Sequence, residues 1–256
     1  MSDAARLEQA RHGAVLVLTL DDAARRNALS LPLREMLADA LEAAEGDRSV
    51  RAIVVTGASG NFCSGGDLVG MQVPDALAGR ERLRRVHRLI RLLVAGSKPV
   101  VAAVEGWCVG AGLSLACACD LVVTAENARF LAAFNRVGLM ADLGLGWTLP
   151  ARVGLGRAKR ILFLGQQITP AQAESWGLAD EVVPSGSALA TALERAQFLA
   201  AQAPAPMAMT KTMLAAGLDA ALEAERHYQT LLFLSADHAE GRSAFLEKRE
   251  PRFGTE

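Results

Sequence analysis

A single acid, Asp142, stands in the segment FNRVGLMADLGLGW, which covers residues 134–147 and consists largely of glycines and apolar side chains. Removing a carboxylate from water is costly unless something compensates it, so its presence suggests that the molecule needs the charge. Burial among leucines should raise the pKa of Asp142 toward neutrality, which suits a base that takes up and returns a proton. The alternative is structural, because the following residues could begin a helix that Asp142 would cap.

Two glycine-rich segments could supply the rest of a reaction site. FCSGGDL, residues 62–68, follows the apolar run AIVVT, and GWCVGAGLSLACACD, residues 106–120, follows PVVAAV. Gly65 and Gly66 leave backbone N–H groups open where a strand should end. Gly110 and its small neighbours keep a helix start bare, where N–H donors and the helix dipole favour a negative oxygen. Each segment could instead be an ordinary tight turn or a place of close helix packing.

Other motifs and the composition exclude several classes of protein. The glycines do not form G-x-G-x-x-G, and the P-loop lysine is missing, which disfavours a nucleotide-binding fold. The four cysteines have no C-x-x-C spacing and no histidine cluster beside them, so neither a disulfide framework nor a zinc site is expected, and Cys63 is expected to pack. With 27 basic and 28 acidic residues, the partner should be a small molecule or another subunit rather than nucleic acid or a membrane surface.

The first half of the chain alternates between strand and helix patterns. A helix is predicted over 30–44, with Ser30 as its N-cap and Pro32 in its first turn. Continuous apolar runs suit strands that are covered on both faces. These runs lie at 14–20, 52–56, 99–104 and 121–124. Such an order predicts an α/β domain built from crossover units.

From about residue 150 the strand signal fades and the pattern becomes helical. Helices are predicted in RAKRILFLG, PAQAESWG, ALATALERAQFLAAQ and LDAALEAERHYQTLLFL, with a short break at Ala-Pro-Ala-Pro, 203–206. Leu231 to Leu234 are four successive apolar residues, more than one helix face needs, and they suggest a subunit interface. Burial of these residues on the chain's own domain is the alternative. The basic helix face of Arg84, Arg85, Arg88 and Arg91 should be solvated, with the phosphate groups of a ligand as a secondary possibility.

Two observations indicate a cytoplasmic protein. The N-terminal MSDAARLEQARHG is charged and lacks the apolar core of a secretion signal. The apolar stretch from Pro99 to Ala125 is interrupted by Glu105, Asp120 and three glycines, so it should form a buried strand, helix and strand rather than a membrane span.

Five blocks together give the sequence a resemblance to a known family. They are FCSGGDL, KPVVAAVEGWCVGAGLSLACACDLVV, GLMADLG, PAQAESWGLADEVVP and EGRSAFLEKREPRF. In this order, and in register from about residue 13 to 253, they resemble the enoyl-CoA hydratase/isomerase family, or crotonase superfamily. The resemblance implies a spiral of strand-strand-helix units over 1–195, which holds the acyl-CoA site, and a helical region over 196–256 that assembles homotrimers or dimers of trimers.

The resemblance also implies roles for individual residues. The N–H groups of Gly66 and Ala111 would form an oxyanion hole for the thioester carbonyl of an acyl-CoA, and Asp67 would hold the turn. CoA is carried by the substrate, so no cofactor and no metal is expected. Residues 69–82 would help to shape the acyl pocket. The candidate substrate- and CoA-binding residues are Arg25, Arg26, Ala28, Ser64, Gly66, Asp67, Leu68, Ala111, Ser114, Phe134, Phe245 and Lys248.

The acid pattern decides which reaction the resemblance implies. Hydratases of the family use two glutamates, and the matching positions hold Ser114 and Phe134 here. Neither can activate water or deliver a proton as an acid does. Asp142 falls where the isomerases of the 3-enoyl to 2-enoyl type carry a catalytic acid, as do the oxepin-forming isomerases of phenylacetate breakdown. Shifting a double bond needs a single base, so the expected activity is an enoyl-CoA isomerase with Asp142 as that base.

Three alternatives stay open on the sequence. A hydratase could use Asp142 alone with water, and it would share every other site residue. The dehalogenase branch of the family uses an aspartate in this region as a nucleophile, but it places an indole upstream, where only Phe134 is found here. A catalytically silent CoA-binding scaffold would explain the missing glutamates, but not the retained acid.

Overall fold

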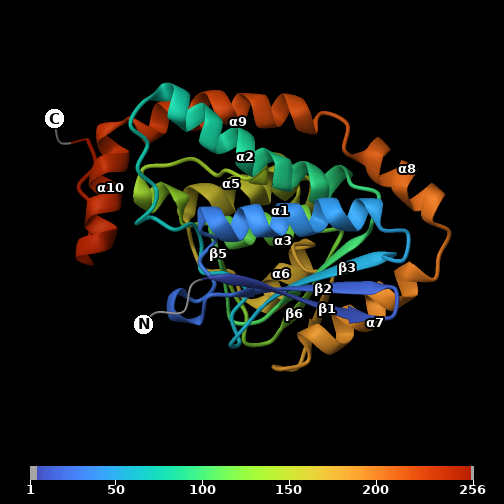
Figure 1. Cartoon of the computed structure of the whole chain (residues 1–256). Helices are drawn as coiled ribbons and strands as arrows, with labels where there is room; N and C mark the ends of the chain where they lie inside the picture. The colour runs from blue at the N-terminus through green and yellow to red at the C-terminus, as the bar shows by residue number, and fades with distance from the viewer. Residues whose placement is uncertain (1–4, 255–256) are drawn as a thin grey trace.

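The computed structural model describes residues 5–254, which fold around a six-stranded sheet (Figure 1). The strand order is β1-β2-β3-β4-β6-β8, and a separate two-stranded sheet pairs β5 with β7. Only β1 runs antiparallel to its neighbour. The strands are β1 Arg6–His12, β2 Val15–Asp21, β3 Ala52–Gly57, β4 Val100–Val104, β5 Trp107–Val109, β6 Leu121–Ala125, β7 Arg129–Leu131 and β8 Glu181–Val183.

Helices cover both faces of the main sheet. The helices predicted over 30–44 and in the four segments of the second half correspond to α1, α5, α6, α7 and α9, whereas α8 and α10 were not predicted. The α-helices are α1 Leu31–Gly46, α2 Ala76–Ala95, α3 Ala111–Ala118, α4 Leu145–Val153, α5 Leu155–Leu164, α6 Pro170–Trp176, α7 Ala188–Ala200, α8 Pro204–Leu214, α9 Leu218–Phe233 and α10 Ala236–Glu247. Short 3₁₀ turns, η1 and η2, lie at Ala23–Arg25 and Phe134–Val137. The α/β class expected from the alternating first half is therefore confirmed.

The central strands are buried on both sides, as their continuous apolar runs predict. Along β2, Leu16 and Leu18 belong to the core cluster that includes α1, while Val15 and Val17 belong to a second cluster that includes α7. Successive side chains of a strand point to opposite faces. The two clusters are therefore the two sides of the sheet, and α1 and α7 lie on opposite sides of it in Figure 1.

Two strands of the main sheet were not expected from the sequence. The side chains of β1 are mostly exposed and polar, so that strand carries no apolar pattern and is defined by its antiparallel pairing with β2. In the helical second half, Glu181–Val183 forms β8 at the other edge, parallel to β6. The expected break at 203–206 is also shorter than predicted, because α8 already begins at Pro204.

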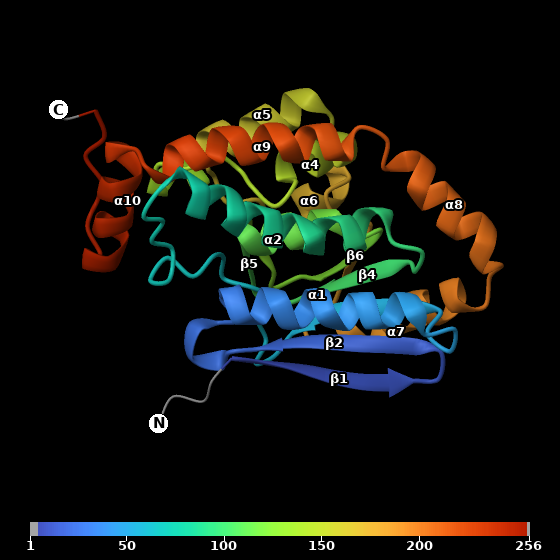
Figure 2. The same ribbon diagram turned by 45° about the horizontal axis from the view of Figure 1, so that its top comes forward.

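The C-terminal helices pack back onto the first half of the chain. Figure 2 shows α9 lying beside α2. Helix α7 packs against β2, β3, β4 and β6 of the main sheet. The predicted boundary after residue 195 falls inside α7, whose buried Ala188, Ala192 and Ala196 complete the second core cluster. The outermost residues of the predicted ranges, 1–4 and 255–256, lie outside the described residues.

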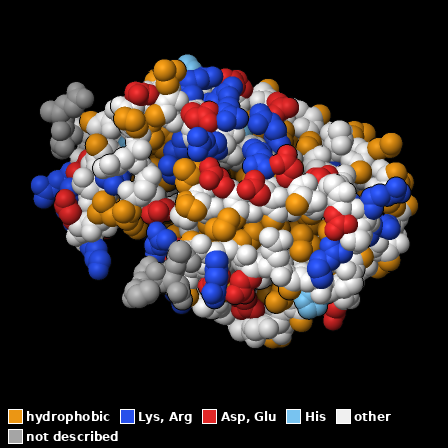
Figure 3. Space-filling model, in the orientation of Figure 1, with side chains coloured by type: hydrophobic (Ala, Val, Ile, Leu, Met, Phe, Trp, Pro, Cys, Tyr) orange, Lys and Arg blue, Asp and Glu red, His pale blue; other side chains and the backbone are white. Residues whose placement is uncertain are grey.

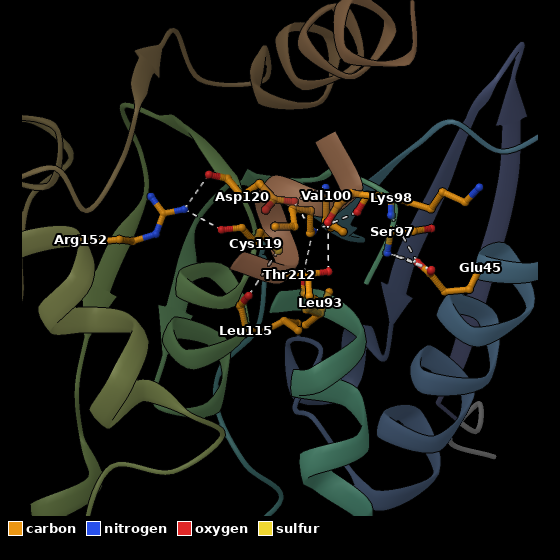
Figure 4. A network of polar contacts seen from close by, with 12 residues as sticks. Glu45, Leu93, Ser97, Lys98, Val100, Leu115, Cys119, Asp120, Arg152 and Thr212 are labelled. Atoms are coloured by element: carbon orange, nitrogen blue, oxygen red, sulfur yellow. Dashed lines mark hydrogen bonds and ion pairs between the residues drawn. The ribbon is translucent and has the colours of Figure 1, made fainter. Parts of the chain in front are cut away.

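A polar network joins α8 to the sheet at the end remote from the glycine-rich segments. The buried Lys211 Nζ donates to the carbonyl oxygens of Leu93 and Lys98 and lies 2.5 Å from Asp120 Oδ2. Asp120 Oδ2 also accepts from the N–H of Val100, and Arg152 bonds the carbonyl of Asp120 (Figure 4). Losing one partner of such a buried pair would leave the other charge uncompensated, so the network fixes α8 in place.

No helix in the described part of the chain is both long enough and apolar enough to cross a membrane.

Candidate active site

The two glycine-rich segments and the segment of Asp142 meet at one cavity of about 260 Å³. Most of its wall is apolar, and Asp142 is the only carboxylate that the described residues contribute to it. Its lining comprises Arg34, Ser64, Gly65, Gly66, Leu68, Met71, Val109, Gly110, Ala111, Leu131, Ala133, Phe134, Arg136, Val137, Leu139, Asp142 and Phe245. Residues from five separate parts of the chain thus converge where the sequence predicted a site.

Several backbone N–H groups on the wall have no acceptor in residues 5–254. Two of them belong to Gly66, in the loop after β3, and to Ala111, the first residue of α3. The N–H of a first helical residue has no partner within the helix, and the helix dipole makes this end electropositive. An oxygen that develops negative charge in the cavity could therefore accept from both groups.

Strand-like pairing holds these two donors in register. The N–H of Cys63 donates to the carbonyl of Trp107, and the N–H of Val109 donates back to the carbonyl of Cys63. On the other side, the N–H of Leu29 donates to the carbonyl of Gly65 at 2.8 Å. The bare segment FCSGGDL is thus more than an ordinary tight turn, because backbone hydrogen bonds secure it on both sides.

Glycine is required at the meeting point of the two segments. A β-carbon on Gly112 would lie only 2.5 Å from the carbonyl oxygen of Cys63, closer than any real contact. The preceding Gly110 has a φ of +50°, a conformation that side chains disfavour. Close packing and open donors therefore occur together in GWCVGAG.

Asp142 is not a helix cap. The helix after it, α4, begins at Leu145 with Gly144 as its N-cap, and Asp142 precedes Leu143, which has a left-handed φ of +54°. The Asp142 side chain is only 6% exposed and lies on the cavity wall. Left-handed conformations at residues other than glycine are strained and concentrate at functional sites. Of the two interpretations, the structure rules out the capping role.

Two side chains of helix α9 form hydrogen bonds to the Asp142 segment. Gln229 Nε2 lies 3.3 Å from Asp142 Oδ2 and also donates to the carbonyl of Met140, while its Oε1 accepts from the N–H of Met140. One turn earlier on α9, the carboxylate of Glu225 accepts from the N–H of Gly144 at 2.8 Å and contacts His87 Nε2 of α2. The backbone before and after Asp142 is therefore hydrogen-bonded to the same helix.

The buried surroundings change the acidity of Asp142. Burial raises its pKa to about 6, and the negative charge of Glu225 acts in the same direction. Arg34, the Gln229 hydrogen bond and Arg82 oppose this by favouring the ionised form. The carboxyl group is thus ionised at neutral pH, yet it can hold a proton that it has taken up.

Ser114 lies in a different place from that expected of a substrate-binding residue. Its side chain is fully buried in α3, is not part of the cavity wall, and donates to the carbonyl of Asp142 at 2.9 Å. The hydroxyl therefore fixes the backbone of the acid.

Several candidate CoA-binding residues lie around the mouth of the cavity, and their roles stay predictions. Ser64, Leu68, Phe134 and Phe245 contribute to the wall. Phe245 reaches it from α10 of the same chain although its side chain remains largely exposed. Phe134 belongs to η2 and lines the same cavity as Ala111.

The AARRNAL segment forms a tight turn beside Ser64. Ser64 Oγ donates to the carbonyl of Arg25, whose exposed guanidinium pairs with Asp22 and with Asp67. Asp67 also accepts from the N–H of Val69, which agrees with its expected role in holding the turn. The remaining candidates are the exposed Arg26, the buried Ala28 and the exposed Lys248, the C-cap of α10. None of these three is part of the cavity wall.

The arginines of α2 form surface ion pairs rather than a free basic face. Arg84 and Arg85 pair with Glu81, Arg88 pairs with Asp39 and Glu42, and Arg91 pairs with Asp219. Basic and acidic side chains are accordingly interspersed over α2 in Figure 3. Such exposed pairs contribute little to stability, and they lie away from the wall of the cavity.

Cys63 is buried between the two segments, and burial raises the pKa of its thiol to about 11. The thiol therefore stays protonated and inert at neutral pH, as expected for a packing residue. Within residues 5–254, no group of three or more His, Cys, Asp or Glu side chains is placed to hold a metal ion.

Several residues that shape the site were not identified from the sequence. Arg34 lies in the buried stripe of α1, and Glu225 and Gln229 lie in the buried stripe of α9. A signal existed in each case, because each is a polar residue at a position where the helical period places apolar ones. Their partners are far away in the sequence, so the pattern alone could not show what they contact.

Comparison with known proteins identifies the family of the chain. The family model described as enoyl-CoA hydratase/isomerase matches residues 10–256. The chain belongs to the enoyl-CoA hydratase/isomerase family. It is therefore an acyl-CoA enzyme of the crotonase superfamily, as the five sequence blocks indicated.

Some relatives are named as isomerases and others as hydratases. The chain is 37% identical over 247 residues to 1,2-epoxyphenylacetyl-CoA isomerase of Escherichia coli K12, covering 93% of this chain and 94% of that protein. It is 39% identical to 2,3-dehydroadipyl-CoA hydratase of the same organism, covering 95% and 96%. The crystal structure of an enoyl-CoA hydratase from Mycobacterium avium subsp. paratuberculosis K-10 matches with a TM-score of 0.87 at 33% identity, covering 96% and 98%. The fold is thus that of the family.

Proposed function

We propose that this enzyme shifts a double bond in an acyl-CoA, converting a 3-enoyl-CoA to a 2-enoyl-CoA, with Asp142 as its single base. The observation that supports this is the cavity wall, where the described residues supply one carboxylate and where the N–H groups of Gly66 and Ala111 have no acceptor among the described residues. Moving a double bond by two proton transfers requires one group that accepts a proton and gives it back. This composition of the wall matches that requirement.

In the first step, the ionised carboxylate of Asp142 removes a proton from C2, next to the thioester carbonyl. The electron pair of the C–H bond moves toward the carbonyl, and the oxygen becomes negative as a dienolate forms. The N–H groups of Gly66 and Ala111 stabilise this oxygen, and one such donor is typically worth about 3 to 4 kcal/mol in the transition state. The apolar wall keeps water away, which strengthens both hydrogen bonds.

In the second step, the protonated Asp142 returns the proton to C4. The double bond then lies between C2 and C3, the carbonyl is restored, and the carboxylate is ready for another cycle. A carboxyl group with a pKa of about 6 suits both steps, because neither its acid nor its base form is strongly disfavoured near neutral pH. Gln229 and Ser114 keep the group in position while it changes charge.

Hydration of a 2-enoyl-CoA is the second candidate, favoured by relatives such as the 2,3-dehydroadipyl-CoA hydratase. That reaction adds a water oxygen to C3 and a proton to C2, and two acidic groups usually share the work. Here the second position is Phe134, and the first is Ser114, whose hydroxyl is buried behind the acid. The proposal of an isomerase rests on this lack of a second acid in the wall.

The test compares two reactions of the same purified protein. Turnover of a 3-enoyl-CoA should exceed hydration of the corresponding 2-enoyl-CoA, and Asp142→Asn should lower isomerase turnover by about 100- to 10,000-fold, the usual contribution of a general base. Affinity for CoA should change little. Asp219→Asn, an exposed carboxylate on α9, is the matched control and should retain full activity.

Three results would contradict this assignment. Strong hydration with weak isomerisation would favour the hydratase, and unchanged turnover in Asp142→Asn would remove the proposed base. If no thioester reacted while CoA still bound, the chain would instead be a catalytically silent scaffold.

A further inference from the structure

Arg34 is a buried cation in the cavity wall that the proposed reaction does not use. Its side chain is only 4% exposed and rises from the buried stripe of α1. Its Nε donates to the carbonyl of Leu29 at 2.8 Å. Among residues 5–254, no acceptor is found for its two terminal nitrogens, and no carboxylate forms an ion pair with it.

The guanidinium lies beside the proposed oxyanion hole. A β-carbon built on Gly66 would lie 3.4 Å from Arg34 Nη2, so the terminal nitrogens adjoin the loop that supplies one of the two N–H donors. Asp142 and Asp67 act on Arg34 electrostatically without hydrogen bonding to it. Burial lowers the pKa of Arg34 to about 10, so the group remains charged at neutral pH.

Burying a charged group whose N–H donors have no acceptor is unfavourable unless a ligand supplies the acceptors. A guanidinium presents its N–H groups in a planar fork, which fits carboxylate oxygens especially well and bonds to neutral oxygen acceptors too. The other cations near Asp142 are less available. Arg136 donates to the carbonyl of Gly165, and Arg82 donates to the carbonyl of Gly70 and is not part of the wall.

We propose that Arg34 is a specificity-determining residue that binds an oxygen atom on the acyl group of the substrate, beyond the thioester carbonyl. The inference rests on the proposed function only in that the acyl group of a CoA thioester fills this cavity. The preferred substrates would then be acyl-CoAs with an oxygen substituent on the chain rather than plain hydrocarbon chains. A carboxylate should bind most tightly, because its charge complements that of the guanidinium.

The oxygen should lie within a few bonds of the reacting carbons. Gly66 fixes the thioester oxygen on one side, and Arg34 adjoins the same glycine. The wall also includes Met71, whose side chain adjoins Gly66 as Arg34 does, and Leu68, and their apolar side chains offer no competing donor to such an oxygen. Arg34 would therefore decide which acyl groups enter, while Asp142 acts on them.

Binding of saturated acyl-CoAs, measured by calorimetry, tests this without any turnover. Three ligands of equal chain length are compared: a plain acyl-CoA, one with a keto oxygen on the chain, and one that ends in a carboxylate. The native enzyme should bind the oxygen-bearing ligands about 10- to 100-fold more tightly than the plain one, the effect of one charge-assisted hydrogen bond. Arg34→Met should abolish this preference, and Arg34→Lys, which keeps the charge, should retain part of it.

Affinity for CoA alone and the thermal unfolding curve show whether each variant is folded. The inference is overturned if the native enzyme binds the plain ligand as tightly as both oxygen-bearing ones, or if the preference survives in a folded Arg34→Met. The comparison within the native enzyme stands even if that variant does not fold. These saturated ligands cannot be isomerised, so the binding test is independent of the isomerase assay. If oxygen-bearing ligands bind more tightly but no 3-enoyl-CoA is isomerised, only the proposed reaction is contradicted. If a 3-enoyl-CoA is isomerised but the ligands bind equally, only this inference is contradicted.

Discussion

The carboxyl group of Asp142 is held where its charged form is disfavoured. Burial raises its pKa from 3.8 to about 6, so the folded protein binds this proton more tightly than the unfolded chain does. The stabilisation by the proton is complete below pH 3.8 and is lost as the pH rises through about 6. Above that range the ionised acid reduces the free energy of unfolding by about 3 kcal/mol.

Asp142→Asn should therefore be more stable than the native protein at alkaline pH. Asparagine stays neutral and can still accept from Gln229, so the melting temperature of the variant should be higher at pH 8. At pH 5 the difference should shrink by about half, because the native carboxyl is then mostly protonated when folded. Thermal unfolding of both proteins at the two pH values measures this. An equal difference at both would show that the acid is not buried in its charged form.

At this scale the sequence predicted which residues meet but not what supports them. Asp142 was noticed as a lone acid among apolar residues, and Gly66 and Ala111 were assigned by the family resemblance. All three line one cavity, and their roles stay predictions. Gln229 and Arg34 could not be assigned, because what they do depends on Met140 and Gly66, which only folding brings near. The pattern of a single helix contains no information on which distant backbone it will meet.

Among the elements, the contact between α3 and the FCSGGDL segment determines the spacing of the two N–H donors. Gly112→Ala would place a methyl group 2.5 Å from the Cys63 carbonyl, so the segments must separate. Overpacking of this kind costs about 1 to 3 kcal/mol, and the displaced donor at Ala111 should lower turnover as well. Thermal unfolding and isomerase assays measure the two effects.

Gly156→Ala in α5 is the matched control for this substitution, because nothing lies within 4 Å of its added β-carbon. It should be neutral or slightly stabilising, since alanine favours helix. If Gly112→Ala behaved like this control, the packing of α3 would not determine the geometry of the donors.

The elements themselves were predicted with uneven success for a physical reason. The predicted strands corresponding to β2, β3, β4 and β6 were found because burial on both faces requires apolar residues throughout. The edge strands β1 and β8 were missed, since an edge strand is formed by its pairing and needs little apolar surface. Apolar sequence patterns thus identify buried central strands more reliably than edge strands, which are defined by backbone pairing.

For the whole molecule, the outer side of α9 carries apolar side chains that nothing in the described chain covers. Leu231 is 57% exposed and Leu234 47%, beside the exposed Tyr228. Of the four successive apolar residues, only Phe233 is buried. The family resemblance predicts a homotrimer or a dimer of trimers, and this face is a candidate for the interface between subunits.

Introducing charges on this face should change the assembly. The double substitution Leu231→Glu and Leu234→Glu would place two carboxylates in a dry interface, so the mass measured by analytical ultracentrifugation should fall toward that of one chain. Gln197→Glu, an exposed position on α7, is the control and should leave the mass unchanged. An oligomer that survives the double substitution would place the interface elsewhere.

Besides its exposed apolar side, helix α9 has a buried side, where Glu225 and Gln229 form hydrogen bonds to the backbone on either side of Asp142. The same helix thus contacts the segment of the reacting carboxyl group and forms part of the outer surface of the subunit. A neighbouring subunit that covered the exposed side of α9 would contact the same helix that positions Asp142. Assembly would then be expected to affect the position and the pKa of this carboxyl group without any change in the residues that line the cavity.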